Sequence, residues 1–350
     1  MVTITDVARH AGVSTATVSH VLNGTRYVSE ETQARVLAAV NELGYRPNRL
    51  ARSLALGETH TLGLIIPDQA NPFFAELARG VEDTAFERGY NVILCNSYGD
   101  LDKELRYQEV LSQKQVDGIL MVAAGASVEH VQDLQAQGVP LVIVDRDLTD
   151  ASVDKVLGNN LKGGQLATNH LFQLGHRRIG CITGPSQVTP SSERVIGYRR
   201  VLEETGIALD QELIVRGDFQ PESGYQGTRK LLALENTPTA IFACNDLMAI
   251  GVISAAAELG RSVPADLSVV GYDNISLSAF ANPPLTTIVQ SGYEQGALAV
   301  ELLLERIQNP DLSPRREILD THLLVRQSTS LVAECPRKPR SRHGQCDLPG

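Results

Sequence analysis

The chain has 350 residues, 43% of them hydrophobic, and a formal net charge of −10 at pH 7. This length provides enough apolar side chains for two or three folded units. The acidic balance excludes a protein that coats nucleic acid with its whole surface. Residues 1–60 differ from this average, because they hold six arginines and five acidic residues. Any contact with phosphate is therefore expected from this segment.

Cysteine usage and hydropathy favour a cytoplasmic protein. The five cysteines form no CxxC pair and no paired Cys/His spacing, which disfavours a zinc site and fits a reduced compartment. The N-terminus has no charged leader followed by an apolar segment, and no run of 18 apolar residues occurs. We therefore expect neither secretion nor insertion into a membrane.

Residues 3–23 predict two short helices joined by a glycine turn. Thr3 is a helix-start residue with Asp6 three positions later, which is the spacing of a capping box. Gly12 supplies a permissive backbone for the turn, and Ser14 then caps the second helix. The outward face of that helix would carry short or polar residues: Thr15, Ala16, Thr17, Ser19, His20 and Asn23. Such a face suits a helix that enters a major groove, although an ordinary helical hairpin has the same spacing.

The next segments indicate a third helix and a hinge. A helix-start signal at Ser29 precedes a helix that runs to about Leu43, so residues 1–45 are expected to form a helix-turn-helix DNA-binding domain. Residues 46–60 contain a proline near their start, arginines and leucines, which predicts a short hinge helix followed by a linker. Residues 333–350 are rich in basic residues and proline, and we expect a disordered tail there.

From residue 61 onward, apolar strand runs alternate with helical stretches. The runs that predict strands are 62–67, 91–95, 118–123, 141–145, 177–184, 239–246 and 267–273. Continuous apolar strands that alternate with helices are typical of parallel sheets covered on both faces. So many βα units exceed one small sheet. We therefore predict an α/β core with two doubly wound parallel-sheet lobes, next to the small all-α head.

Polar side chains follow these strands, at the place where ligands bind on such sheets. The candidates are Asn71, Phe73, Phe74, Asp145, Arg146, Asn245, Asp273 and Gln290, with Arg194 and Phe219 further from the strand ends. Carboxylates, amides and guanidinium groups make paired hydrogen bonds to vicinal hydroxyls, and phenylalanine faces pack on flat C–H surfaces. Each residue also has a structural alternative, since a carboxylate beside an arginine can be a simple ion pair and an Asn-Asp pair can cap a helix.

Catalytic motifs are absent from the sequence. It contains no GxGxxG, no phosphate loop ending in GK[ST], no HExxH and no GxSxG. Ser152 and Lys155 have the SxxK spacing, but we expect them in a short loop between strands. No set of residues combines a nucleophile, a base and oxyanion donors, so no enzyme activity is expected.

Residues 2–332 resemble the lactose/galactose repressor (LacI/GalR) family of bacterial regulators. DVARHAGVSTATVSHVLN is similar to the family's head, ARSL at 51–54 to its hinge helix, and NPFF, VDR, GHRRIGCITGP, NDLMAIG, VVGYDN and PPLTTI to its core. The resemblance implies a core like that of periplasmic sugar-binding proteins. Its N-terminal and C-terminal lobes would be 61–161 plus about 291–321, and 162–290 plus about 322–332.

The resemblance also implies roles for individual residues. Within the family the nearest likeness is to ribose and purine repressors, and the ten strand-end candidates match nearly the full set of sugar contacts in ribose-binding relatives. The purine repressor shares the GDF phenylalanine and the PESGY stretch, but lacks the DR pair and the ND at the matching places. The implied DNA contacts are Thr3, Thr5, Ser14, Thr15, Ala16, Thr17, His20, Asn23, Arg26 and Leu54, of which the last would enter a minor-groove step as a wedge.

These features together predict a homodimeric, allosteric transcriptional repressor of a ribose-type sugar operon. Operator DNA and ribose or a related pentose would be its partners, with no metal, no cofactor and no membrane involved. The alternative within the same architecture is a purine-responsive repressor, in which ligand strengthens operator binding. A sugar-transport receptor is disfavoured by the helix-turn-helix head and the absent signal peptide.

Overall fold

A computed structural model describes residues 2–24, 26–45, 58–113, 116–123, 128–148, 150–186 and 188–332. The chain divides into two compact units, Met1–Thr59 and His60–Gly350. Most of the predicted hinge, including Leu54, and the predicted tail lie outside the described residues. None of the helices in the described part is long and apolar enough to cross a bilayer.

The first unit contains three helices, α1 Ile4–Ala11, α2 Thr15–Asn23 and α3 Glu30–Leu43. Thr3 and Asp6 form the predicted capping box, and Gly12 takes the left-handed backbone of the turn with φ +67°. The Ser14 hydroxyl accepts the Thr17 N–H at 3.0 Å and caps α2. A small apolar core holds the three helices together: Val7, Ala8, Ala11, Val18, Val36 and Ala39. Because these residues point inward, the opposite side of α2 is left for other contacts.

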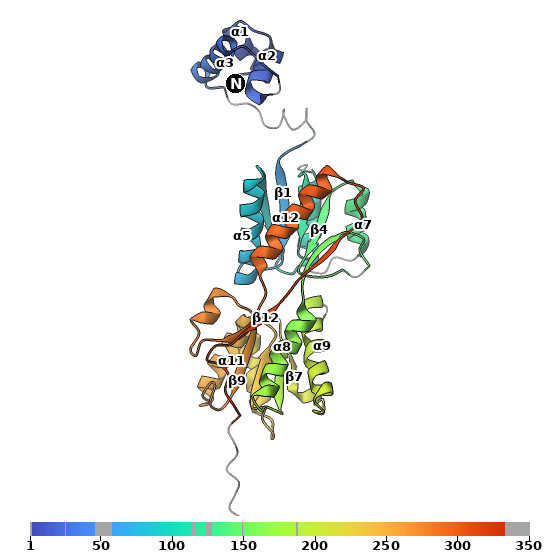
Figure 1. Ribbon diagram of the computed structural model, residues 1–350, viewed down its shortest axis with the longest axis vertical. Coiled ribbons are helices and arrows are strands. Elements are labelled where there is room, and N and C mark those ends of the chain that lie inside the picture. Colours follow the sequence, from blue (N-terminus) through green and yellow to red (C-terminus); the bar gives the residue numbers. More distant parts are fainter. Residues whose placement is uncertain are drawn as a thin grey trace, which may run out of the picture. The chain divides into compact units, whose positions relative to one another are not determined.

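The second unit contains two six-stranded sheets, and each sheet with its helices is called a lobe (Figure 1). The first lobe has the strand order β11-β5-β4-β3-β1-β2, and every neighbouring pair is parallel. Its strands are β1 Thr61–Ile66, β2 Asn91–Asn96, β3 Gly118–Met121, β4 Leu141–Val144, β5 Asp154–Gly158 and β11 Arg316–Leu319. Its helices are α5 Pro72–Glu87, α6 Leu101–Gln113, α7 Val128–Ala136 and α12 Gly292–Gln308.

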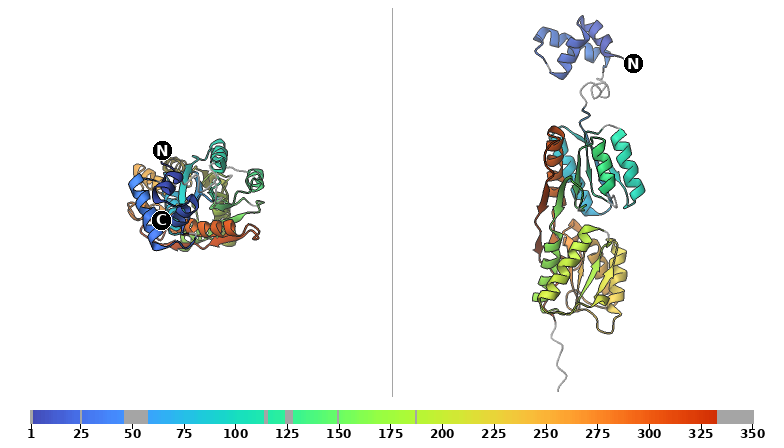
Figure 2. Two further views of the ribbon diagram at one scale, coloured as in Figure 1. Left: turned by 90° about the horizontal axis from the view of Figure 1, so that it is seen from above. Right: turned by 90° about the vertical axis from the view of Figure 1, so that its right-hand side faces the viewer.

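Successive residues of β1 show how helices cover both faces of this sheet. Leu64 packs in one apolar cluster with residues of α5 and α12, whereas Ile65 packs in another with residues of α6 and α7. Figure 2 shows these two helix pairs on opposite sides of the strands. Burial on both faces explains why β1 reads as a continuous apolar run rather than as an alternating one.

The second lobe has the strand order β12-β10-β9-β8-β6-β7. Its strands are β6 Ile179–Thr183, β7 Ile214–Arg216, β8 Ala240–Ala243, β9 Ser268–Asp273, β10 Thr286–Val289 and β12 His322–Leu324, of which β12 runs antiparallel to β10. Its helices are α8 Asn160–Gln173, α9 Thr189–Glu204, α10 Pro221–Leu232 and α11 Asp246–Glu258, with short 3-10 turns η1 Gln211–Leu213 and η2 Ser276–Ala279. The lobe is thus an α/β sheet with one antiparallel edge strand.

The chain passes between the lobes three times: between β5 and α8, between β10 and α12, and between β11 and β12. Strand β5 is a correction to the sequence analysis, which expected Lys155 in a loop. Asp154 and Lys155 at the start of β5 interrupt the apolar run by which a buried strand is recognised. Both are buried, and each is paired with residues of opposite charge. Asp154 binds Arg306 and Arg315, and the Lys155 ammonium lies 2.8 Å from Asp147.

Close contact between α8 and α9 places a key arginine of the second lobe. A Cβ atom added at Gly164 of α8 would lie 2.2 Å from the Arg194 carbonyl oxygen of α9, and one added at Gly197 would lie 2.3 Å from the Leu161 carbonyl oxygen. Only glycine allows the two backbones to approach this closely. The position of Arg194 therefore depends on a glycine in the neighbouring helix.

We predict that Gly164→Ala destabilises the second unit by about 1–3 kcal/mol, because the new methyl group meets backbone that has no room to move. Gly227→Ala on α10 is the matched control, since its nearest neighbour is the mobile end of the Ile182 side chain at 3.0 Å. Urea unfolding of both variants measures the difference. Equal stability of the two would show that this helix contact is not tight.

Candidate functional site

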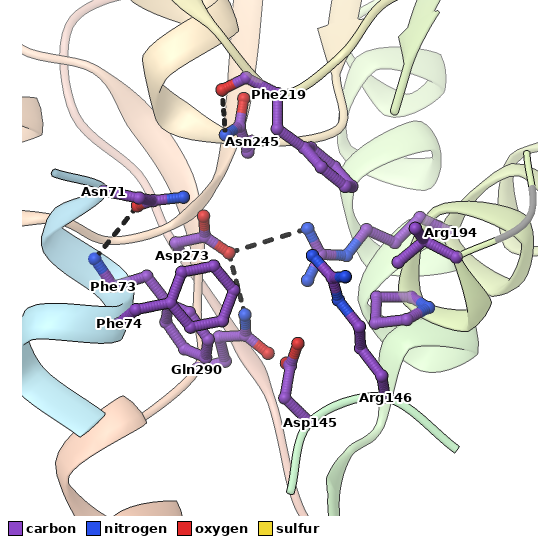
Figure 3. A pocket seen from close by; sticks show the side chains of 12 residues that line it. Asn71, Phe73, Phe74, Asp145, Arg146, Arg194, Phe219, Asn245, Asp273 and Gln290 are labelled. Carbon is purple, nitrogen blue, oxygen red and sulfur yellow. Dashed lines mark hydrogen bonds and ion pairs between the residues drawn. The ribbon is translucent and has the colours of Figure 1, made fainter. Parts of the chain in front are cut away.

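The ten strand-end candidates lie around one pocket between the two lobes (Figure 3). They line it together with Val188 and Pro190. The lining residues are Asn71, Phe73, Phe74, Asp145, Arg146, Val188, Pro190, Arg194, Phe219, Asn245, Asp273 and Gln290.

The first lobe contributes the start of α5 and the end of β4. Asn71 caps α5 through its side-chain oxygen, which accepts the Phe73 N–H at 3.1 Å, and its amide nitrogen is directed toward the cavity (Figure 3). The rings of Phe73 and Phe74 meet edge to face, with centroids 5.2 Å apart. Asp145 follows β4 with φ +64°, an uncommon backbone for a residue other than glycine. Such strain often marks residues that are held for a function.

The second lobe contributes a deeply buried arginine. Arg194 donates from Nε to the Asn160 side-chain oxygen at 2.9 Å and from Nη1 to the Cys244 carbonyl at 2.5 Å. Its guanidinium carbon lies 3.6 Å from the centre of the Tyr272 ring, and Nη1 lies 3.5 Å from Asp273 Oδ1. Burial opposes the charged form, but Asp273 and Tyr272 outweigh it, and the pKa of Arg194 is raised. Arg194 is therefore a fixed cation on the pocket wall.

Asp273 stands opposite Arg194 at the end of β9. Its Oδ1 accepts a hydrogen bond from Gln290 Nε2 at 2.8 Å, and its backbone also has a positive φ, +104°. Burial raises the pKa of Asp273 to about 7, with the charge of Asp145 in the same direction and Arg194 against it. The carboxyl group of Asp273 thus titrates close to neutral pH.

Three buried polar atoms of the pocket have no hydrogen-bond partner in the described structure: Asp145 Oδ1, Arg146 Nε and Gln290 Oε1. Burial raises the pKa of Asp145 and lowers the pKa of Arg146, although the attraction between the two opposes both shifts. Unpaired polar atoms inside a protein cost about 1–3 kcal/mol each. They therefore mark positions where a ligand with donors and acceptors would be stabilised.

Phe219 and Asn245 complete the lining from the second lobe. Phe219 has φ +70°, and its carbonyl accepts the Asn245 side-chain N–H at 2.9 Å. The side-chain oxygen of Asn245 accepts the Met248 N–H at 2.9 Å, so this residue also caps α11. Asn245 therefore does cap a helix, as the structural alternative for the Asn-Asp pair proposed. This cap holds the Asn245 side chain at the pocket.

Hydrogen bonds between the lobes lie beside the pocket, and no sequence pattern indicated them. Gln220 donates to Asp68 at 3.0 Å, and the Thr189 hydroxyl donates to the Asp147 carbonyl at 2.8 Å. Val188 and Pro190 were missed as well, because an apolar residue at the start of a helix carries no pattern that distinguishes a ligand wall from a core. Only the folded chain brings these pairs together.

The DNA-contact candidates lie on the first unit. Thr3, Thr5, Ser14, Thr15, Ala16 and Arg26 are exposed, and Thr17 and His20 are half-buried. Asn23 is the last residue of α2, and Leu54 lies outside the described residues. Exposed Thr15 and Ala16 stand at the N-terminal end of α2, which is the end of a recognition helix that meets base edges.

The residues of the described part contain no group of three or more His, Cys, Asp or Glu side chains arranged to hold a metal ion. Cys95, Cys181 and Cys244 are buried, as expected for small apolar side chains in or at the end of strands. The chemistry of the pocket is thus that of paired carboxylates, guanidinium groups, amides and aromatic rings.

Comparison with known proteins identifies the family of the chain. A family described as bacterial regulatory proteins, lacI family, matches residues 3–48, and a periplasmic binding protein-like domain matches residues 168–329. The chain is 45% identical to the ribose operon repressor of Escherichia coli (strain K12), over 94% of this chain and all of that one. It is 44% identical to the HTH-type transcriptional repressor PurR of Aliivibrio salmonicida (strain LFI1238), over 92% of this chain and 96% of that one.

Solved structures agree with these relatives. The lac repressor dimer bound to operator and the anti-inducer ONPF superposes with a TM-score of 0.85 at 30% identity, over 94% of this chain and 99% of that one. A LacI family transcriptional regulator from Enterococcus faecium with bound ribose superposes with a TM-score of 0.73 at 33% identity, over 78% of this chain and all of that one. The chain belongs to the lacI family of bacterial regulatory proteins, with a helix-turn-helix DNA-binding head and a periplasmic-binding-like core.

Proposed function

We propose that this regulator represses a ribose-type sugar operon as a homodimer on operator DNA, in the cytoplasm. Ribose or a closely related pentose, bound in the pocket between the lobes, would be its effector. The observation that carries this proposal is the set of unpaired buried polar atoms among aromatic rings in one pocket. The ribose operon repressor relative and the ribose-bound neighbour support the same effector class.

A small polyol suits the hydrogen-bonding groups of this pocket. A hydroxyl group both donates and accepts, so vicinal hydroxyls can donate to Asp145 Oδ1 and Gln290 Oε1 and accept from Arg146 Nε. Phe73, Phe74 and Phe219 offer apolar surface for the C–H face of a sugar ring. A ligand with several hydroxyls would thus satisfy groups that are costly to leave unpaired.

The charge of the pocket favours a neutral ligand. Two carboxylates face two guanidinium groups, so the formal charges of the lining balance. A phosphate on the sugar would bring further negative charge into a buried site whose formal charges already balance. We therefore expect free ribose to bind more tightly than ribose 5-phosphate.

A purine corepressor is the second candidate, because the PurR relative is nearly as similar as the ribose operon repressor. The phenylalanine rings that line the pocket could also stack on a flat base. The two candidates also differ in how the ligand changes operator affinity. A purine would strengthen operator binding, whereas ribose would weaken it.

Coupling to DNA would arise from the lobes. Asp145 and Arg146 come from the first lobe and Arg194 and Asp273 from the second, so a ligand that touches all four favours one arrangement of the lobes. A ligand shifts an equilibrium only by its difference in affinity for the two states. Contacts from both lobes provide that difference, and by linkage the ligand then changes operator affinity by the same factor.

For the recognition helix, we predict that Ala16→Gln changes which bases are preferred, at about 1–3 kcal/mol for a changed contact. Selection from randomised operators measures this preference. Arg35→Ala on α3 is the contrasting variant: if this exposed arginine meets phosphate, all sequences should weaken alike and the salt dependence should become less steep. An unchanged base preference for Ala16→Gln would contradict the placement of α2 in the major groove.

For the pocket, we predict that Asp145→Ala or Arg146→Ala abolishes ribose binding in calorimetry while operator affinity without ligand is retained. The result would be a repressor that no longer responds, because each change removes a charged partner from the ligand. Arg229→Ala is the control, since this exposed arginine pairs with Glu258 on the surface of the second lobe. Normal ribose affinity in both pocket variants would reject the assigned site.

For Asp273, we predict that the free energy of unfolding of Asp273→Asn rises relative to that of wild type as pH increases toward 7. Its pKa is raised from 3.8 to about 7, so between these values the folded protein holds a proton that the unfolded chain has released. Wild-type stability from this group is therefore lost as pH rises toward 7 and changes little above it. Relative to wild type, the stability of Asp273→Asn should rise by about 2–3 kcal/mol between pH 5 and pH 7.5 in urea unfolding without ligand. A pH-independent difference would show that the carboxyl group is not perturbed.

A further inference from the structure

Asp246, the first residue of α11, is a buried carboxylate beside the pocket. Its side chain is fully buried, and it is not among the residues that line the cavity. Oδ2 accepts the Ile275 backbone N–H at 2.9 Å, and Oδ1 accepts the Thr287 hydroxyl at 2.5 Å. One carboxylate therefore joins the start of α11, the turn after β9 and strand β10.

Each of these three segments carries a residue of the pocket. Asn245 immediately precedes Asp246 in the chain, and Asp273 lies two residues before Ile275. Gln290 lies three residues after Thr287 and donates to Asp273 at 2.8 Å. The hydrogen bonds of Asp246 thus fix the backbones of three lining residues relative to one another.

The turn after β9 needs such a restraint. Asp273 and Asn274 have φ values of +104° and +56°, so two successive residues other than glycine occupy the left-handed half of backbone space. A conformation of this kind is strained and persists only where its surroundings enforce it. Two hydrogen bonds hold the turn: Arg326 donates to the Asn274 side-chain oxygen at 2.7 Å, and Asp246 accepts the next backbone N–H, that of Ile275, at 2.9 Å.

Strand β9 is also shaped to admit the carboxylate. A Cβ atom added at Gly271 would lie 2.2 Å from Asp246 Oδ1. Any side chain at that position of β9 would displace the carboxylate or the strand. The glycine two residues before Asp273 therefore leaves the space that Asp246 occupies.

We propose that Asp246 is a positioning residue for effector binding, which holds Asp273 and Gln290 in place without touching the ligand. Loss of its carboxylate leaves the Ile275 N–H and the Thr287 hydroxyl unpaired in the core. The turn then relaxes toward negative φ, and the Asp273 carboxylate moves away from Gln290 and Arg194. The identity of the ligand in this inference rests on the proposed function, whereas the state of the turn does not.

The test compares two threonine-to-valine variants that each remove one buried hydroxyl. Thr287→Val removes the donor to Asp246, whereas the control Thr228→Val removes a hydroxyl that donates to the Gly224 carbonyl within α10. Both threonines are fully buried. Asp246→Asn and Asp246→Ala form a graded pair, because asparagine keeps one oxygen acceptor and alanine keeps none.

Two measurements are made well below the unfolding temperature. Hydrogen exchange of residues 273–279 in the unliganded protein should be at least about tenfold faster in Thr287→Val and in the Asp246 variants than in Thr228→Val. Ribose affinity by calorimetry should fall about tenfold in the same variants and stay within about twofold of wild type in the control. If Asp246→Ala does not fold, Thr287→Val and Asp246→Asn still decide the outcome.

Exchange and ribose affinity equal to those of Thr228→Val would overturn the positioning role. If wild type itself binds no ribose but the turn exchanges faster in the variants, the positioning role of Asp246 on Asp273 stands and the proposed effector is wrong. If the turn is unchanged while wild type binds ribose normally, the proposed function stands and this inference fails.

Discussion

The central constraint of the structure is the burial of two carboxylates and two guanidinium groups in one small pocket. Charged groups taken out of water are stable only with good partners, and removing one partner is costly. Arg194 is held by Asn160, the Cys244 carbonyl and Asp273, but Asp145, Arg146 and Gln290 each retain an unpaired buried atom. The pocket is thus a polar site in which a ligand would supply the hydrogen bonds that these buried atoms lack. The glycine contact between α8 and α9 and the left-handed turns serve to hold these groups in place.

Because the pocket lies between two lobes, a ligand bound to its buried charged groups contacts both lobes. The pocket's charged groups come in equal number from the two lobes, and three crossing segments connect those lobes. A ligand that completes their hydrogen bonds therefore stabilises one arrangement of the lobes over others. In a lacI-family regulator, a DNA-reading head belongs to the same chain as this pocket. The proposed response to a pentose needs no more than this difference in affinity between the two arrangements.

Sequence patterns predicted strands where the apolar run was continuous, and they missed β5, which begins with buried charged residues. Strand β1 was predicted from its apolar run. Strand β5 was missed because two charged residues begin it: Asp154 is paired with Arg306, 152 residues away, and Lys155 with Asp147, 8 residues away. Polar residues directly after apolar strands predicted most of the pocket. Asp246 was interpreted as part of a helix cap, since its partners Ile275 and Thr287 lie 29 and 41 residues away. Local pattern carries no information on such partners.

The most direct test of this account is the affinity of the full-length protein for its operator, measured by gel-shift titration with ribose, ribose 5-phosphate, hypoxanthine or guanine added separately. Ribose is expected to weaken operator binding, ribose 5-phosphate to act only at higher concentration, and neither purine to strengthen the complex. Tighter operator binding with a purine, together with no response to ribose, would contradict it and identify the protein as a purine-responsive repressor.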